Sequence, residues 1–291
     1  MICPYCYARH AADDLLMSCG PSCSPPAVFP AKSLHRNRCA HGRLPRARRV
    51  CPSCSRPVPR EYAEAPGRSI LVTGTGKSTW LTSVVHHLST GEIVPGLSVR
   101  LLGDSSRARY ADLRARSVEP ILLSLRRAGA SPAVLALYEL SDVCPPGLLA
   151  SAAGVVRLID PVELPRVRQL LNRPPEPPSS VPERPHPIPA APPALDWPTH
   201  LPMALAVTKL DLVWDMFDHG SPLRRLTPPT SAYLESDGLD VHHEVAAWLD
   251  RWGDLPAAQR CFALSPHAAG YRVADPLLWL LTRFGAFGVR S

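Results

Sequence analysis

Three groups of residues in this sequence have types and spacings that could support chemistry, and the first is a glycine loop. It consists of Gly74, Thr75, Gly76, Lys77, Ser78 and Thr79. An apolar run over 70–73 precedes it, and apolar residues at helical spacing follow it over 78–89. Backbone N–H groups at a helix start, together with a lysine and a hydroxyl, bind phosphates and Mg²⁺. The loop therefore predicts a nucleotide phosphate site, in which Lys77 reaches the β- and γ-phosphates and Ser78 binds Mg²⁺.

The loop is shorter than the full phosphate-loop pattern, which places four residues between its first glycine and its Gly-Lys-Ser end. Here one residue separates Gly74 from Gly76, and Leu71 stands where the pattern has its first glycine. A shorter loop offers fewer N–H groups to a β-phosphate. The alternative interpretation is a strand-to-helix turn that carries Gly-Lys-Ser by chance.

The second group follows another apolar run, over 204–207, and consists of Thr208, Lys209 and Asp211. Thr-Lys-x-Asp resembles the guanine-specificity motif of GTPases. The Asp211 carboxylate can accept from both N1–H and the exocyclic amine of guanine, a donor pair that adenine lacks, while the Lys209 stem would pack over the base. Ser265, after the run over 262–264, matches the serine of the loop that completes such a guanine pocket.

The third group is a set of cysteines, since seven of the nine precede residue 55. Two Cys-x-x-Cys pairs, Cys3 with Cys6 and Cys51 with Cys54, predict a closed tetrahedral zinc site with a structural role. The interval between the pairs contains Cys19, Cys23, Cys39 and His41, which could form a second zinc site. Free surface thiols are the alternative interpretation for both sets.

The charge of the chain is concentrated in the same region. The net charge is +7, and residues 1–69 hold 11 basic and 4 acidic residues, whereas the remainder is balanced. The densest basic run consists of Arg43, Arg46, Arg48 and Arg49. Such a run could contact nucleic acid or another acidic partner, or could be a solvated loop.

The elements that must position these groups alternate between strands and helices. Strands are expected over 70–73, 97–102, 120–125, 134–140, 155–159, 203–207 and 261–264, and helices over 78–89, 105–116, 164–171, 241–252 and 275–284. This alternation predicts an α/β fold: a P-loop NTPase-type, mostly parallel sheet with helices on both faces, preceded by a small Cys-rich zinc-ribbon module.

The chain divides into two expected units within its 291 residues. A zinc-ribbon-like module is expected over 1–62, and a GTPase-like domain over 69–291, interrupted by a proline-rich linker or insertion over 173–198. Eleven of the 25 residues over 174–198 are proline, which excludes a helix or central strand there and leaves a spacer or a docking ligand. With no secretory signal and no long apolar run, a cytoplasmic location is expected.

Seven short motifs occur in an order that resembles a known family. They are Cys3–Cys6, Val50–Cys54, Gly76–Leu81, Gly103–Tyr110, Leu158–Pro161, Thr208–Asp211 and Asp275–Trp279. Over nearly its whole length the chain resembles the bacterial double-GTPase proteins of the TRAFAC class, in the form with an N-terminal zinc ribbon. The resemblance implies GTP or GDP with Mg²⁺, a structural Zn²⁺, and a switch role in a bacterial conflict or regulatory system beside a second GTPase or an effector.

The catalytic strand departs from the family pattern. Glu139 stands where an aspartate holds Mg²⁺, and Asp142 stands where a glycine senses the γ-phosphate. If the protein is a GTP hydrolase, Lys77 and Glu139 are its expected catalytic residues, and we expect weak nucleotide binding with slow or absent hydrolysis. The alternative is a non-catalytic scaffold, a pseudo-GTPase with a zinc ribbon that recruits protein or nucleic-acid partners.

Overall fold

The computed structural model describes most of the chain. The described residues are 1–19, 28–30, 48–65, 67–91, 96–112, 119–127, 132–140, 144–171, 197–198, 200–224, 235–252, 260–266 and 271–285. Several features singled out in the sequence lie outside these ranges: Cys23, Cys39, His41, Arg43, Arg46, Asp142 and nearly all of the proline-rich segment.

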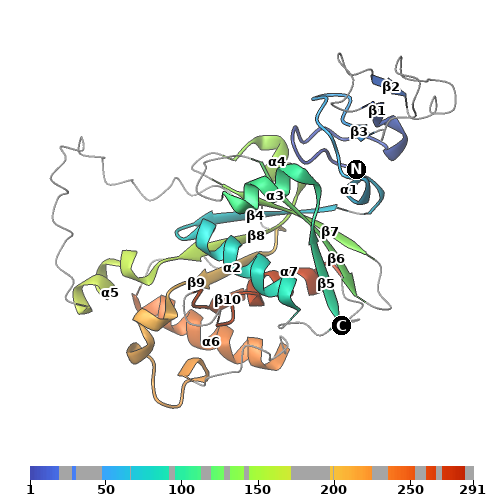
Figure 1. Cartoon of the computed structure of the whole chain (residues 1–291). Helices are drawn as coiled ribbons and strands as arrows, with labels where there is room; N and C mark the ends of the chain where they lie inside the picture. Colours follow the sequence, from blue (N-terminus) through green and yellow to red (C-terminus); the bar gives the residue numbers. More distant parts are fainter. Residues whose placement is uncertain are drawn as a thin grey trace.

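A seven-stranded sheet forms the centre of the molecule (Figure 1). Its strands, in spatial order, are β10 (Arg260–Ala263), β9 (Met203–Val207), β8 (Ala152–Ile159), β4 (Gly67–Gly74), β7 (Ala133–Glu139), β6 (Ile121–Arg127) and β5 (Leu97–Leu101). The strands from β10 to β7 run parallel to one another, and β6 pairs antiparallel with both of its neighbours. The seven predicted strands are all present, and the predicted α/β class with a mostly parallel sheet is confirmed.

The central strands are apolar on both faces, as parallel strands between two covering layers must be. Every residue of β9 is buried, and Ile70, Leu71 and Val72 of β4 are completely buried. Ile70 and Val72 join the hydrophobic cluster on one face, whereas Leu71 joins a cluster on the other. The sheet is therefore the partition between the two halves of the core.

Two helices cover the first face. They are α2 (Lys77–Thr90), which begins at the glycine loop, and α7 (Asp275–Arg283). Trp80 and Val84 of α2 and Leu277 of α7 belong to one buried cluster with strand residues. The Trp80 indole N–H donates to the Val273 carbonyl at 2.9 Å, which joins the two helices' ends across this layer.

The opposite face is covered by more segments. They are α1 (Arg60–Glu64), α4 (Pro146–Ser151), α5 (Pro165–Leu170) and α6 (Glu235–Trp252). The α3 helix (Gly103–Ala111) lies along β6, where the Ser106 hydroxyl accepts from the Leu122 amide.

Short 3-10 helices occupy Ala12–Asp14, Pro161–Glu163, Leu210–Leu212, Trp214–Met216 and Pro222–Arg224. Among the described residues, every helix is too short or too polar to cross a membrane.

The N-terminal module contains a small sheet, which Figure 1 shows beyond α1 at the outer end of the module. Its strands lie in the order β2 (Val28–Pro30), β1 (Leu16–Ser18) and β3 (Arg48–Val50), all antiparallel. Cys3, Leu15 and Cys51 share a hydrophobic cluster with strand residues of the large sheet. The cysteine turns therefore pack directly against the α/β core.

One strand residue makes a buried polar contact across this boundary. Tyr138 of β7 is buried, and its hydroxyl donates to the Pro4 carbonyl at 2.9 Å. Burial raises the pKa of Tyr138, so its hydroxyl stays protonated and remains a donor. The Tyr7 ring also meets the Tyr138 ring edge-on, with centroids 6.0 Å apart.

Candidate functional site

The residues predicted from the first two motifs gather at one edge of the large sheet. Because β4, β7, β8, β9 and β10 are parallel, their carboxyl ends share that edge. It carries the glycine loop after β4, Glu139 at the end of β7, Thr208 after β9 and Ser265 after β10. The chain leaves β4 toward the β5 side of the sheet and leaves β8 toward the β10 side, and such a switch point is where open α/β sheets bind ligands.

The turn into α2 requires its first glycine for a steric reason. Gly74 has φ +92°, and a methyl group there would lie 1.8 Å from the Leu158 carbonyl oxygen. Gly76 has φ +82°, but a methyl group there would meet no atom within 4 Å. The Thr75 amide donates to the same Leu158 carbonyl at 3.3 Å, so the loop lies directly against β8.

This difference gives a matched pair of variants. Gly74→Ala should lower the free energy of unfolding by at least about 2 kcal/mol, because backbone strain is joined by a clash with a main-chain atom. Gly76→Ala carries only the strain of a left-handed residue, about 1 kcal/mol. Urea denaturation of both variants measures the difference; equal losses would contradict the close approach of Gly74 to Leu158.

The side chains of the loop are bonded to protein groups. The Lys77 ammonium donates to the Gly74 carbonyl at 2.8 Å, and the Thr75 hydroxyl lies 2.9 and 3.0 Å from the two carboxylate oxygens of Glu163. Glu163 lies in the 3-10 helix after β8 and is absent from the sequence prediction. Its negative charge beside the loop would repel an incoming phosphate.

The two residues predicted to hold Mg²⁺ are in direct contact. The Ser78 hydroxyl donates to Glu139 Oε1 at 2.8 Å, while Arg109 donates to Glu139 Oε2 at 2.5 Å. The Arg109 side chain is 5% exposed and that of Glu139 is 17% exposed, which makes this a largely buried ion pair. Arg109 of α3 thus neutralises the carboxylate that would otherwise attract a cation. Arg109 lies within a motif that the sequence singled out, but its partner could not be read from spacing.

The residues predicted to recognise guanine are also brought together, with one additional partner. The Ser265 hydroxyl, which is completely buried, donates to the Asp211 carboxylate. Lys209 has φ +52° and forms an ion pair with Asp160 at 2.5 Å. The Thr208 hydroxyl donates to the Ile159 carbonyl at 3.1 Å. Asp211 itself is exposed, so its carboxylate remains accessible at this edge of the sheet.

A single turn joins the two halves of this candidate site. Residues 158–163, at the end of β8, contact the glycine loop through Leu158 and Glu163 and contact the base segment through Asp160. Lys77 and Asp211 therefore lie at the same sheet edge on either side of one turn.

The first set of cysteines forms a second candidate site, a metal centre in the N-terminal module. The Sγ atoms of Cys3, Cys6, Cys51 and Cys54 all lie within 4.8 Å of one another. The Cys3–Cys54 and Cys6–Cys51 sulfur distances are 3.8 and 3.6 Å. A zinc ion at about 2.3 Å from four tetrahedral thiolates separates its ligands by about 3.8 Å. The cluster therefore has the dimensions of a four-cysteine zinc site.

Two equivalent turns build this cluster. Tyr7 follows the first pair and Ser55 follows the second, and both have positive φ, 63° and 57°. The Tyr7 amide donates to the Cys3 carbonyl at 3.0 Å, and the Ser55 amide donates to the Cys51 carbonyl at 2.8 Å. This repeated turn geometry explains why two pairs so far apart in sequence present their thiols alike.

The thiols of the cluster differ in acidity. Burial raises the pKa of Cys3. For Cys51 burial also acts upward, but hydrogen bonds from the Cys54 and Ser53 amides and from neighbouring thiols outweigh it and lower the pKa to about 6. His10 Nε2 lies 3.3 Å from Cys51 Sγ, an outer contact of the kind that orients metal ligands and one that the sequence did not predict. A thiolate at Cys51 is the form that binds a metal ion.

Of the second cysteine set, the structure describes Cys19, which is buried at the end of β1. Its predicted companions Cys23, Cys39 and His41 lie outside the described residues, so a second zinc site stays a prediction. Comparison of the chain with known proteins gives no further assignment: no protein-family model matches it, and neither does any curated protein.

Proposed function

We propose that this chain is a guanine-nucleotide-binding protein of the P-loop GTPase type, with weak or lost hydrolysis. Its phosphate side would be the loop over 74–79, and its base side Thr208, Lys209, Asp211 and Ser265. We take the cysteine module over 1–62 and the domain over 69–291 as its two units. Through its resemblance to double-GTPase proteins, we further propose a switch role in a bacterial conflict or regulatory system, beside a second GTPase or an effector.

One observation carries this proposal: two motifs about 130 residues apart in sequence meet at the switch point of a mostly parallel sheet, on either side of the turn over 158–163. A nucleotide has a charged end and a base end, and this edge of the sheet offers a lysine on one side of the turn and an exposed carboxylate on the other.

The same contacts support weak hydrolysis. The position expected to hold Mg²⁺ is neutralised by Arg109, and Thr75 is engaged by Glu163. Hydrolysis of a phosphoanhydride needs cations that stabilise the charge on the transferred phosphoryl group. A carboxylate that is already paired attracts Mg²⁺ less, so we expect little dependence of nucleotide affinity on Mg²⁺.

Calorimetric titration tests the function directly. GDP, a non-hydrolysable GTP analogue and ATP would be titrated with Mg²⁺ and with a chelator, and GTP turnover would be measured in parallel. We expect guanine nucleotides to bind and ATP not to bind, with Lys77→Ala lowering the affinity. Tighter binding of ATP than of guanine nucleotides would contradict the proposed nucleotide. Rapid GTP turnover that is lost in Lys77→Ala would contradict the proposed weak or lost hydrolysis.

Asp211→Asn should change the base preference. An amide offers one acceptor and one donor, so it cannot accept from both N1–H and the amine of guanine, whereas xanthine presents a donor beside an acceptor. We expect GDP affinity to fall at least about tenfold, or about 1.4 kcal/mol, and xanthosine diphosphate to bind more tightly than GDP.

Asp215→Asn is the matched control for this prediction. Asp215 lies in the same segment, is fully exposed and pairs only at 3.4 Å with Arg224. GDP affinity should stay unchanged in that variant. An Asp211→Asn protein that retains its GDP affinity would remove Asp211 from the binding site.

A scaffold without nucleotide is the second candidate, and one observation favours it. Lys77, Ser78 and Thr75 are each bonded to a group of the protein itself, so the loop is internally satisfied. In that case the domain would recruit partners by its surface. Absence of any nucleotide binding in the calorimetric titration, from a protein that retains its fold, is the result that would favour the scaffold.

For the cysteine cluster we propose a structural Zn²⁺ held by Cys3, Cys6, Cys51 and Cys54. Four thiolates close the coordination sphere and leave no position for substrate, which excludes a catalytic role for such an ion. The ion would fix both cysteine turns, of which the first presents the Pro4 carbonyl to Tyr138.

A further inference from the structure

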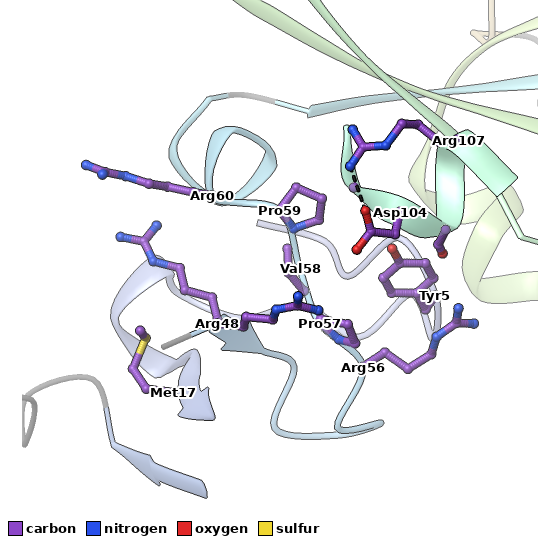
Figure 2. A pocket seen from close by; sticks show the side chains of 13 residues that line it. Tyr5, Met17, Arg48, Arg56, Pro57, Val58, Pro59, Arg60, Asp104 and Arg107 are labelled. Atoms are coloured by element: carbon purple, nitrogen blue, oxygen red, sulfur yellow. Dashed lines mark hydrogen bonds and ion pairs between the residues drawn. The ribbon is translucent and has the colours of Figure 1, made fainter. Parts of the chain in front are cut away.

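A cavity of about 480 Å³ lies between the cysteine module and the start of α3. Five arginines line it: Arg48, Arg49, Arg56, Arg60 and Arg107. Figure 2 shows the Arg48 and Arg60 side chains on one side of the cavity and Arg56 beside Tyr5 on the other. Neither the glycine loop nor the guanine segment contributes to its wall, so this cavity is separate from the candidate nucleotide site.

The positive charge of the cavity is only partly neutralised. Glu64 accepts from both Arg49 and Arg60, while Arg56 pairs with Glu119. Arg107 pairs with Asp104, as the dashed line in Figure 2 marks. Three carboxylates thus pair with four of the five guanidinium groups. Arg48 is exposed, and no ion pair joins it to another residue in the described part of the chain.

Part of the cavity wall is apolar. Met17 and Val58 are buried there, and Pro57 and Pro59 flank Val58 (Figure 2). The Tyr5 ring is covered by the Arg56 guanidinium, which lies 4.0 Å from its centroid. A ligand that fits this cavity therefore combines several anionic groups with apolar or flat parts between them.

We propose that this cavity binds the phosphodiester backbone of a single-stranded nucleic acid. Guanidinium groups match phosphate oxygens with two parallel hydrogen bonds, and binding a phosphate chain releases its condensed counterions. The module as a whole carries the excess charge of the protein, since residues 1–69 account for all of the +7. This charge draws a polyanion toward the cavity.

Two features of the cavity favour a nucleic acid strand over other anions. The carboxylates of an acidic peptide would replace carboxylates that four of these arginines already bind within the chain, so little binding energy would be gained. A duplex is read by elements that project into its grooves, whereas a concave site receives a flexible strand. Since Tyr5 is covered by Arg56, base stacking contributes little, and binding should tolerate any sequence.

The test is fluorescence anisotropy of a labelled oligothymidylate and a labelled oligouridylate, titrated with the full-length zinc-loaded protein over a range of salt. We expect binding to both, with log K falling as log salt rises by about 0.7 for each phosphate contact. Arg48→Ala combined with Arg60→Ala should weaken binding at least about tenfold and flatten the salt slope by about 1.4, the share of two contacts.

The control removes the same charge elsewhere. Arg9→Ala combined with Arg127→Ala changes two exposed arginines outside the cavity, and should leave affinity within about threefold of the original, as expected for a loss of general attraction alone. Zinc content should be unchanged in both double variants, which shows that the module has folded.

Three results would overturn the proposal. They are an absence of oligonucleotide binding at low salt, equal weakening in the two double variants, and tighter binding of a labelled polyglutamate than of either oligonucleotide. The outcome does not depend on GTP, so failure here leaves the proposed nucleotide site untouched.

Discussion

Replacement of Cys51 by serine is expected to unfold the N-terminal module and to abolish zinc binding. Structural zinc sites contribute about 10–16 kcal/mol in small peptides, more than a module of this size gains from its own core. Cys51 is completely buried and lies in the same cluster as Leu15, Val58 and Tyr138, so its loss opens that part of the core. Metal analysis of the purified protein should give at least one zinc per chain before the change and none at this site after it.

Cys144→Ser is the matched control for this prediction. Cys144 is also a buried thiol of the same hydrophobic cluster, but it does not belong to the four-cysteine group. This variant should keep its zinc and lose only the modest stability of one buried sulfur. A wild-type protein without zinc, or a Cys51→Ser protein with an unchanged content, would refute the metal centre.

The second large effect is expected at the ion pair behind the glycine loop. Glu139→Ala should lower the free energy of unfolding by about 3–5 kcal/mol, because it removes the carboxylate partner of an arginine that is 5% exposed. Replacing both residues with apolar ones, Glu139→Leu with Arg109→Met, should recover most of that loss, since no buried charge then remains. The midpoints of urea denaturation measure both changes.

Glu163→Ala serves as the comparison for Glu139→Ala. Glu163 is exposed, and its bond to Thr75 lies at the surface, so its removal should change stability by no more than about 0.5 kcal/mol. It should, however, favour phosphate near the loop. If Glu139→Ala and Glu163→Ala lower the free energy of unfolding equally, the Arg109–Glu139 ion pair does not stabilise the fold more than the surface contact of Glu163 does.

The strands of the large sheet and the first cysteine cluster were predictable because their signals are local. An apolar run such as Met203–Val207 reads as a buried strand without knowledge of its neighbours, and Cys-x-x-Cys spacing itself positions two thiols. The small N-terminal sheet was missed because its strands have three residues each, too few to show an alternating pattern.

The polar partners at the site could not be read from the sequence. The Arg109–Glu139 pair joins residues 30 positions apart, and Thr75 meets Glu163 across 88 positions. Such contacts depend on which strands are neighbours and on how far each helix extends. Similarly, Tyr138 reads as part of the catalytic strand, and nothing in its spacing indicates a bond to Pro4 across 134 positions.

Tyr138 and Glu139 are consecutive on β7, and consecutive side chains of a strand emerge on opposite sides. The Tyr138 hydroxyl donates to Pro4 in the first cysteine turn, and the Glu139 carboxylate accepts from Ser78 at the start of α2. Two adjacent residues of β7 therefore connect the cysteine module and the glycine loop. Removing the N-terminal unit would leave the Tyr138 hydroxyl without its Pro4 acceptor. It would also expose the hydrophobic residues of the large sheet that now contact Cys3, Leu15 and Cys51. The isolated α/β domain would therefore differ from the same domain in the full chain at β7, next to the residue that contacts Ser78. Nucleotide binding should for this reason be measured on the full-length protein.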